Sequence, residues 1–94
     1  MTAMTGKERA ALRSQAHHLT PAVHVGAAGL TPAVFKSLDE ALAARELVKV
    51  QISRNLDVKP KDAAEALALA TSSSVIQVIG RTMTLFRKKD SAPV

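Results

Sequence analysis

The strict alternation of residues between Leu47 and Ser53 constrains the fold of this chain more than any other feature. Every second residue there is apolar and the residues between are polar: Val48, Val50 and Ile52 alternate with Lys49, Gln51 and Ser53. A period of two is the side-chain repeat of a β-strand that buries one face. The segment is therefore predicted to be a strand with an apolar face and a polar face.

The segments on either side of this strand are predicted to be helices opened by proline. In the first, Thr31 is a hydroxyl N-cap and Pro32 takes the first helical position, where its missing N–H costs nothing. This helix should end near Arg45 and bury one apolar face, formed by Val34, Leu38 and Ala41 with Phe35 and Leu42 beside them. The second should run from Pro60 to about Thr71 and bury Ala63, Leu67 and Ala70.

Three further segments are predicted to be strands. Residues 22–25 alternate and are rich in β-branched side chains. Residues 75–79 and 83–87 are both prone to β-structure and are separated by a turn that begins Gly80-Arg81. Glycine at the first central position supplies the positive φ that a type II′ hairpin turn requires. An antiparallel hairpin is therefore expected near the end of the chain.

A helix is also predicted at the start of the chain, from the capping-box spacing of Thr5 and Glu8 to about His18. Its buried positions should be Leu12, Ala16 and Leu19, whereas Arg9, Arg13 and His17 recur every four residues on an adjoining stripe. Residues 1–4 are expected to be frayed and residues 89–94 to form a disordered tail, so the ordered core should span about 5–88.

The predicted order of elements is helix, strand, helix, strand, helix, strand, strand, which indicates an α/β fold of the two-layer α+β kind. Strand–helix–strand connections of these lengths favour parallel pairs by right-handed crossover, and the last hairpin adds an antiparallel strand. We therefore expect an N-terminal helix followed by βαβαββ, with a mixed four-stranded sheet, in a single domain over residues 1–94.

The charge balance favours a polyanionic partner. Thirteen Lys and Arg residues against eight Asp and Glu give a formal charge of +5. Nucleic acid is one such partner, and an anionic membrane surface would produce the same balance. However, no apolar run of about 18 residues exists and the first residues carry no signal-peptide core. Together with the absence of cysteine, this favours a cytoplasmic protein without a membrane partner.

The inventory of reactive side chains argues against an enzyme. The chain has no Cys, Tyr or Trp and no recognisable carboxylate pair, so a nucleophile or base with an orienting partner is not evident. Asp39 and Glu40 are interpreted as surface charges of a helix. The histidines at 17, 18 and 24 lack metal-ligand spacing. No catalytic residue, metal, cofactor or small-molecule substrate is predicted.

The segment Gly26-Ala27-Ala28-Gly29 joins a predicted strand to a predicted helix and has two explanations. Its backbone N–H groups and the positive end of the helix dipole could hold a phosphate, as the G-x-x-G loop of KH domains clamps a nucleotide backbone. Alternatively, both glycines only supply positive φ where a strand turns into a helix. His24 should lie on the opposite face of its strand from Val23 and Val25, either packed structurally or assisting a phosphate contact.

Two groups of basic residues accompany this segment and could extend a phosphate-binding surface. The first helix carries Arg9, Arg13 and His17, and the hairpin region carries Arg81, Arg87 and Lys88. Each group alone is typical of a solvated face. Phe35 and Phe86 are the only aromatic rings in the sequence, so stacking of single-stranded bases has few platforms. Recognition by phosphate contacts and RNA shape is therefore predicted.

Three stretches closely resemble the CRM (chloroplast RNA splicing and ribosome maturation) domain family of the YhbY type. They are QAHHLTPAVHVGAAGLT at 15–31, RELVKVQI at 45–52 and QVIGRTMTLFR at 77–87. The resemblance implies a fold like the C-terminal domain of bacterial translation initiation factor three, and binding of RNA in precursors of the large ribosomal subunit.

The same resemblance implies particular site residues. It places the family's G-x-x-G loop on Gly26 to Gly29 and its basic hairpin on Arg81 and Arg87. Relatives usually have a polar or basic residue where Ala27 and Ala28 stand, and often Tyr where Phe86 stands, so side-chain contacts are not expected from these positions. A monomeric RNA-binding protein is the favoured hypothesis. The alternative is a module that docks a ribosomal or assembly protein, its charge serving solubility.

Overall fold

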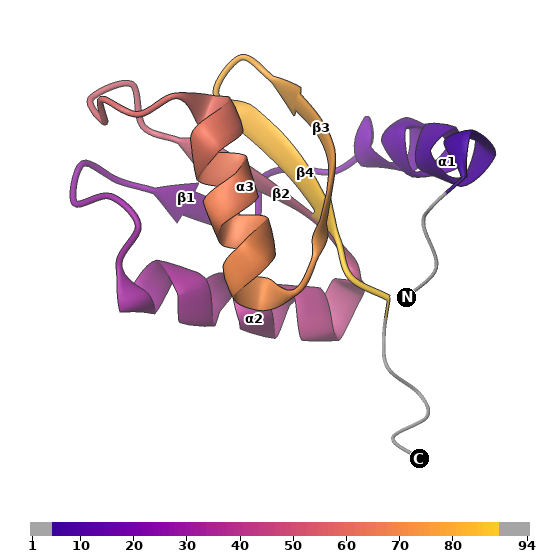
Figure 1. Ribbon diagram of the computed structural model, residues 1–94, viewed down its shortest axis with the longest axis horizontal. Helices are drawn as coiled ribbons and strands as arrows, with labels where there is room; N and C mark the ends of the chain where they lie inside the picture. Colours follow the sequence, from indigo (N-terminus) through magenta and orange to yellow (C-terminus); the bar gives the residue numbers. More distant parts are fainter. Residues whose placement is uncertain (1–4, 89–94) are drawn as a thin grey trace.

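The computed structural model describes residues 5–88, which form seven elements in the predicted order (Figure 1). These are α1 (Gly6–Ala16), β1 (Val23–Val25), α2 (Pro32–Arg45), β2 (Leu47–Ile52), α3 (Pro60–Thr71), β3 (Ser74–Ile79) and β4 (Thr82–Phe86). The predicted frayed start and disordered tail lie outside the described residues. Within residues 5–88, none of the three helices has the length and apolar character needed to cross a bilayer.

The four strands form one mixed sheet in the order β1-β2-β4-β3, which confirms the predicted fold class. β1 runs parallel to β2, and β4 is antiparallel to both β2 and β3. The turn between β3 and β4 contains two residues, Gly80 with φ of 57° and Arg81, and pairs Ile79 with Thr82. Positive φ at only the first central position is the signature of the predicted type II′ turn.

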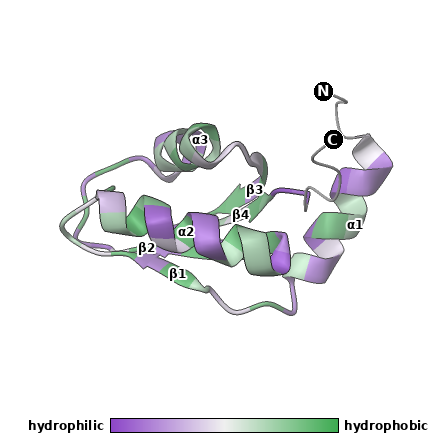
Figure 2. Cartoon of the chain, turned by 90° about the horizontal axis from the view of Figure 1, so that it is seen from below, coloured by the Kyte–Doolittle hydropathy of each residue, from purple (hydrophilic) through white to green (hydrophobic). Residues whose placement is uncertain are grey.

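Helices α2 and α3 cover one face of the sheet and enclose the main core. One row of side chains crosses all four strands beneath them, because Val23 pairs with Val50, and Met83 pairs with both Val50 and Val78. The helices add Leu38, Leu42 and Leu67, each fully buried. Hydrophobic and hydrophilic bands alternate along α2, as one buried helix face requires (Figure 2).

The buried face of α3 includes two of the three predicted residues. Ala63 and Leu67 are buried as expected, but Ala70 is exposed, so that prediction was wrong. The face is completed instead by Ala64, Ala68 and Thr71. Both sets fit a helical period, and the direction of approach of α3 to the sheet selects between them.

Helix α1 packs on the opposite face of the sheet and covers only one end of it. Ala16 is buried against Leu47 and Ile76, and three partly buried side chains surround this second cluster: Leu12, Leu19 and Phe86. Leu47 and Phe86 pair with each other at the end of the sheet remote from the β1–α2 connection. The two-layer description therefore fits α2, α3 and the sheet, and the rest of the second face is left uncovered.

The capping box predicted at the start of α1 is present. The Thr5 hydroxyl accepts a hydrogen bond from the Glu8 N–H at 3.1 Å, and the Glu8 carboxylate accepts one from the Thr5 N–H at 3.0 Å. Hydrogen bonds from the Thr5 backbone and side chain hold the pKa of Glu8 below its ordinary value. The ionised carboxylate is thus the form that stabilises the first turn.

This capping box predicts an acid-sensitive start of α1. Because the pKa of Glu8 is lower in the folded than in the unfolded chain, its stabilisation is complete above the unfolded pKa and is lost as pH falls through the folded one. Glu8→Gln keeps an acceptor oxygen but cannot titrate, so it should flatten this part of the acid profile. Amide exchange of α1 followed by NMR during acid titration measures it, and identical profiles for both proteins would contradict the prediction.

Candidate nucleic-acid interface

The segment from Gly26 to Gly29 forms a tight bend between β1 and α2. The Gly29 N–H donates to the Gly26 carbonyl at 3.0 Å and closes the bend, and the Thr31 N–H donates to the Gly29 carbonyl at 3.0 Å. Thr31 then caps α2, its hydroxyl accepting from the Val34 N–H at 3.3 Å, with proline at the first helical position as predicted. The bend therefore leads directly into a helix N-terminus, the positive end of the helix dipole.

The two glycines of the bend are present for different reasons. Gly29 has φ of 85°, a backbone conformation that is strained for residues with a side chain. A Cβ added there would lie 3.7 Å from Leu56 Cδ1. Gly26 has no positive φ, and an added Cβ there would meet nothing within 4 Å. Positive φ thus explains glycine at 29 but not at 26. Because glycine at 26 has no side chain, a ligand can approach the main-chain atoms of this residue closely.

The bend lies at the surface. Gly26, Ala27 and Ala28 are exposed, and Gly29 is partly buried. Within residues 5–88, the amides of Ala27 and Ala28 donate to no protein acceptor. Neighbouring unpaired N–H groups in a turn form a concavity suited to an anionic oxygen. The bend therefore has the chemistry of a phosphate-binding loop.

A second connection, residues 53–59 between β2 and α3, lies beside the bend at the same end of the molecule (Figure 1). A hollow of about 320 Å³ borders both and includes Gly26, His24 and the exposed Arg54 in its lining. Arg54 was not among the site residues predicted from the sequence. Its position directly after β2 was a usable signal, because parallel pairing with β1 brings the carboxyl ends of both strands together.

Arg81 lies at this same end of the sheet and braces the 53–59 connection. Its Nη1 atom donates to the Ser53 carbonyl at 3.1 Å and to the Leu56 carbonyl at 3.3 Å. The Leu56 side chain lies close in space to Gly29 of the bend. One nitrogen of Arg81 therefore holds the connection that packs against the bend, and the other N–H groups of the guanidinium can donate to an anion.

The basic stripe of α1 lies at the other end of the sheet from the bend. Arg9 is partly buried, and its Nη1 atom donates to the Val75 carbonyl of the edge strand β3 at 2.6 Å. His17 is exposed and lines a second hollow, of about 210 Å³, over the uncovered face of the sheet. Arg13 falls between them on the same stripe. Arg9 thus has a structural role that the sequence did not indicate.

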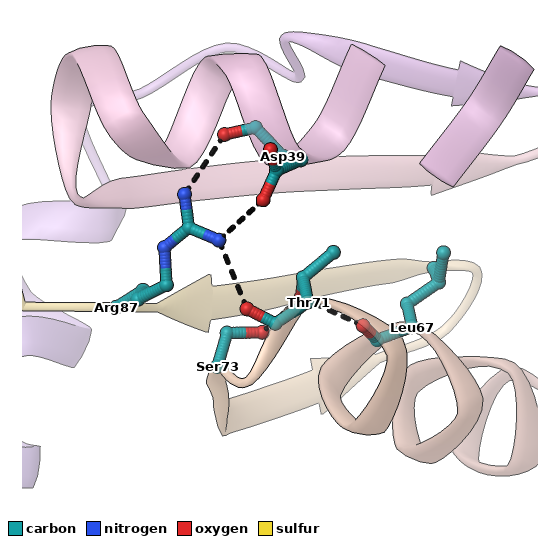
Figure 3. Close-up of polar contacts among 5 residues, drawn as sticks. All are labelled: Asp39, Leu67, Thr71, Ser73 and Arg87. Atoms are coloured by element: carbon teal, nitrogen blue, oxygen red, sulfur yellow. Dashed lines mark hydrogen bonds and ion pairs between the residues drawn. The ribbon is translucent and has the colours of Figure 1, made fainter. Parts of the chain in front are cut away.

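Arg87 and Lys88 are also remote from the bend, because they follow the end of β4 where Phe86 pairs with Leu47. The Arg87 guanidinium is held internally (Figure 3): Nη1 donates to Asp39 Oδ1 at 2.6 Å and to the Thr71 carbonyl at 2.9 Å, and Nη2 donates to the Asp39 carbonyl at 2.9 Å. Arg87 therefore links β4 to α2 and α3. Asp39, interpreted from the sequence as a plain surface charge, is its ion-pair partner. Lys88 is exposed.

The histidines do not gather into a metal site. Within the part of the chain that the structure describes, no group of three or more His, Asp or Glu side chains is placed to hold a metal ion. His24 is exposed while Val23 and Val25 are buried, as the strand alternation predicted. The exposed His24 side chain lines the hollow that also includes Gly26.

Comparison with known proteins gives consistent matches over nearly the whole chain. The model of the CRS1 / YhbY (CRM) domain matches residues 4–87. The chain is 44% identical to the "Probable RNA-binding protein YqeI" of Bacillus subtilis, covering 90% of this chain and 88% of that one. It is 33% identical to a Haemophilus influenzae protein named "RNA-binding protein", covering 100% and 95%. The solution structure of the hypothetical protein SAV1595 from Staphylococcus aureus superposes with a TM-score of 0.80 at 36% identity, covering 95% of this chain and 93% of that one.

Proposed function

Because the chain belongs to the CRS1 / YhbY (CRM) domain family, we propose that it binds RNA through the bend Gly26–Gly29 and the cationic side chains beside it. Relatives that match almost the whole chain are named as RNA-binding proteins, which supports the partner. The choice of site rests on the bend itself, which is exposed. Among the described residues, its amides at Ala27 and Ala28 are unpaired, and the fold does not require glycine at 26.

In the proposed complex, a phosphate oxygen accepts hydrogen bonds from the Ala27 and Ala28 N–H groups. The helix dipole of α2 adds positive potential behind them. Arg54 and Arg81 stand beside the bend and supply full charges, which strengthen hydrogen bonds to phosphate. The methyl side chains at 27 and 28 take no part, so the backbone makes the central contact.

The basic residues predicted from the sequence divide into three groups in this proposal. Arg81 is retained as a direct contact, and Arg13 and His17 as contacts for RNA that extends toward α1. Arg9 and Arg87 are assigned internal structural roles, because their guanidinium groups donate to protein carbonyls and, for Arg87, to Asp39. Lys88 contributes to the overall positive field rather than to the bend.

The proposed mode of recognition is contact with the sugar-phosphate backbone and with RNA shape. Phe35 packs against the main core and Phe86 packs beneath α1, so both aromatic rings are occupied by the fold. Base stacking on aromatic platforms therefore contributes little. In this proposal the chain binds structured ribosomal RNA during assembly of the large subunit. It acts in the cytoplasm as a single-domain monomer and catalyses no reaction.

The salt dependence of binding tests this function. Single-stranded RNA contacts contribute about 0.7 to the slope of log affinity against log salt for each phosphate neutralised. With about three contacts, raising salt from about 50 to about 200 mM should weaken binding about 20-fold. Filter binding or fluorescence anisotropy with a ribosomal RNA fragment measures it, and gel analysis of the recovered RNA should find it intact. A flat salt response would reject phosphate-based binding, and cleaved RNA would reject the absence of turnover.

The alternative function is docking of a ribosomal or assembly protein without RNA contact. Leu69 on α3, with 85% of its surface exposed, is the side chain that most favours it. A single exposed leucine is nevertheless common on monomeric proteins. Co-purification of a protein after nuclease treatment, with no RNA binding at moderate salt, is the result that would support docking.

A further inference from the structure

The uncovered part of the second sheet face forms a polar strip between α1 and the bend. Two cross-strand rows make up this sheet strip. The row nearer the bend contains His24, Gln51, Thr82 and the exposed Ile79, and the row nearer α1 contains Lys49 and Gln77 on either side of the buried Thr84. The first row crosses all four strands from β1 to β3, and the second crosses β2, β4 and β3.

Two hollows lie along the strip, and their linings include residues of the bend and of the α1 region. The hollow of about 210 Å³ contains His17 of α1 together with Lys49 and Gln77. The hollow of about 320 Å³ contains Gln51 and His24 together with Gly26 and Arg54. Gln51 in one lining pairs with Thr82 in the other, so residues of the two hollows are neighbours across β2 and β4. Together the two linings include Gly26 of the bend and His17 beside α1.

Acidic side chains of the described residues lie outside the strip. Residues 5–88 contain seven acidic side chains, four of them on the helix layer: Asp39, Glu40, Asp62 and Glu65. The other three lie on α1, before β2 and in the 53–59 connection: Glu8, Glu46 and Asp57. None of the seven is part of the strip. Lys49 and Arg54 provide cations along the strip, and Gln51, Gln77 and Thr82 provide neutral hydrogen-bond donors.

We propose that the sheet strip binds the single-stranded segment of RNA that leaves the bend and crosses the strands from β1 to β3 beside α1. This inference rests on the proposed function and extends it to a defined path and strand form. The two rows are two residues apart along each strand, so the strip is roughly 7 Å wide in the strand direction, between the bend and α1. One sugar-phosphate strand fits such a strip, whereas a duplex is blocked by α1. Neutral donors along the path suit phosphate and ribose 2′-hydroxyl oxygens without selecting a base.

Removing cations along the strip tests its contribution to RNA affinity separately from that of the bend. In the double variant Lys49→Gln/Arg54→Gln, affinity for a ten-nucleotide oligouridine should fall about tenfold. Affinity for a four-nucleotide oligouridine, about the length that a G-x-x-G loop clamps, should fall only about threefold, because of the two cations only Arg54 lies beside the bend. A ten-base-pair RNA duplex should respond as weakly as the short oligomer. Each variant is compared with wild type on the same RNA, so the greater number of binding registers on longer RNA cancels.

The matched control is Lys36→Gln/Lys61→Gln, which removes the same charge from exposed positions of the helix layer. It should change all three affinities less than about threefold, because distant exposed charges are screened. Equal losses for the two double variants, or equal losses on four and ten nucleotides, would overturn the strip. If Gly26→Asp abolishes binding while Lys49→Gln/Arg54→Gln has no effect, the strip is rejected and the bend stands. If wild type binds the ribosomal RNA fragment but none of these three RNAs, the strip is rejected and the proposed function stands; if it does not bind the ribosomal RNA fragment either, the proposed function itself is rejected.

A second measurement does not depend on the stability of the Lys49 variant. In ¹⁵N-labelled wild-type protein, the ten-nucleotide oligouridine should shift the amide resonances of Gln51, Gln77 and Thr82. The four-nucleotide oligomer should shift those of Ala27 and Ala28 only. Shifts of α3 resonances in place of the strip residues would place the longer RNA on the helix layer and overturn the inference.

Discussion

Replacing Arg87 with alanine is expected to lower the free energy of unfolding by about 2 kcal/mol, with a drop of about 10 °C in Tm for a domain of this size. Its guanidinium joins β4 to α2 and α3 through three hydrogen bonds at 2.6–2.9 Å. The carbonyls of Thr71 and Asp39 lose a charged donor in the variant. We discount the ion pair itself, because the Asp39 side chain is 59% exposed and water screens it.

Urea unfolding of three variants tests this role of Arg87. Arg87→Lys keeps the charge but cannot reach two partners with a planar fork, so it should recover only part of the stability. Arg45→Ala removes an exposed cation from the last turn of α2 and should cost less than about 0.5 kcal/mol. RNA affinity of folded Arg87→Ala should stay within about threefold of wild type. Unchanged stability with a large loss of RNA affinity would instead restore Arg87 as the RNA contact predicted from the sequence.

Replacing Gly26 with aspartate is expected to weaken RNA binding about 100-fold, or about 2.7 kcal/mol, without unfolding the protein. The backbone at 26 needs no positive φ and a Cβ meets no neighbour within 4 Å, so the fold accepts the side chain. The new carboxylate stands where the phosphate should approach. Two like charges about 4 Å apart near a protein surface repel by about 4 kcal/mol, which covers the expected loss.

Two controls isolate the effect of charge at the bend. Ala66→Asp adds the same charge at an exposed position of α3 and should weaken binding less than about threefold. Gly26→Asn has nearly the same size without charge and should cause an intermediate loss. Anisotropy titrations with one RNA at one salt concentration compare them, and urea midpoints verify folding. Equal affinities of Gly26→Asp and Ala66→Asp would remove the bend from the binding site.

The elements of this fold were predictable because their signals are local. Thr31-Pro32, the Thr5 and Glu8 capping box and the Gly80 turn each act within a few residues, and each is present in the structure. The pairing of β3 with β4 was predictable from their turn, but the order of the strands in the sheet was not. Insertion of β4 between β2 and β3, and the choice of Ala68 over Ala70 as a buried residue of α3, depend on how distant elements pack.

The candidate site was predictable in its position but not in its membership. A G-x-x-G segment between a strand and a proline-opened helix is a local pattern, so the bend was found. Which cations surround it depends on strand direction: β4 runs away from the bend, which separates Arg81 from Arg87 by the length of the strand. Parallel pairing of β1 with β2 brings Arg54 to the bend, and spacing within the sequence does not show this.

The position of β4 also governs how the protein is made. The strand synthesised last among the described elements lies in the middle of the sheet, between β2 and β3. On a translating ribosome, β2 and β3 therefore both lack their shared neighbour until Thr82 to Phe86 have emerged. The sheet then closes in one late step, and premature termination upstream of β4 leaves a polypeptide with no route to the native topology.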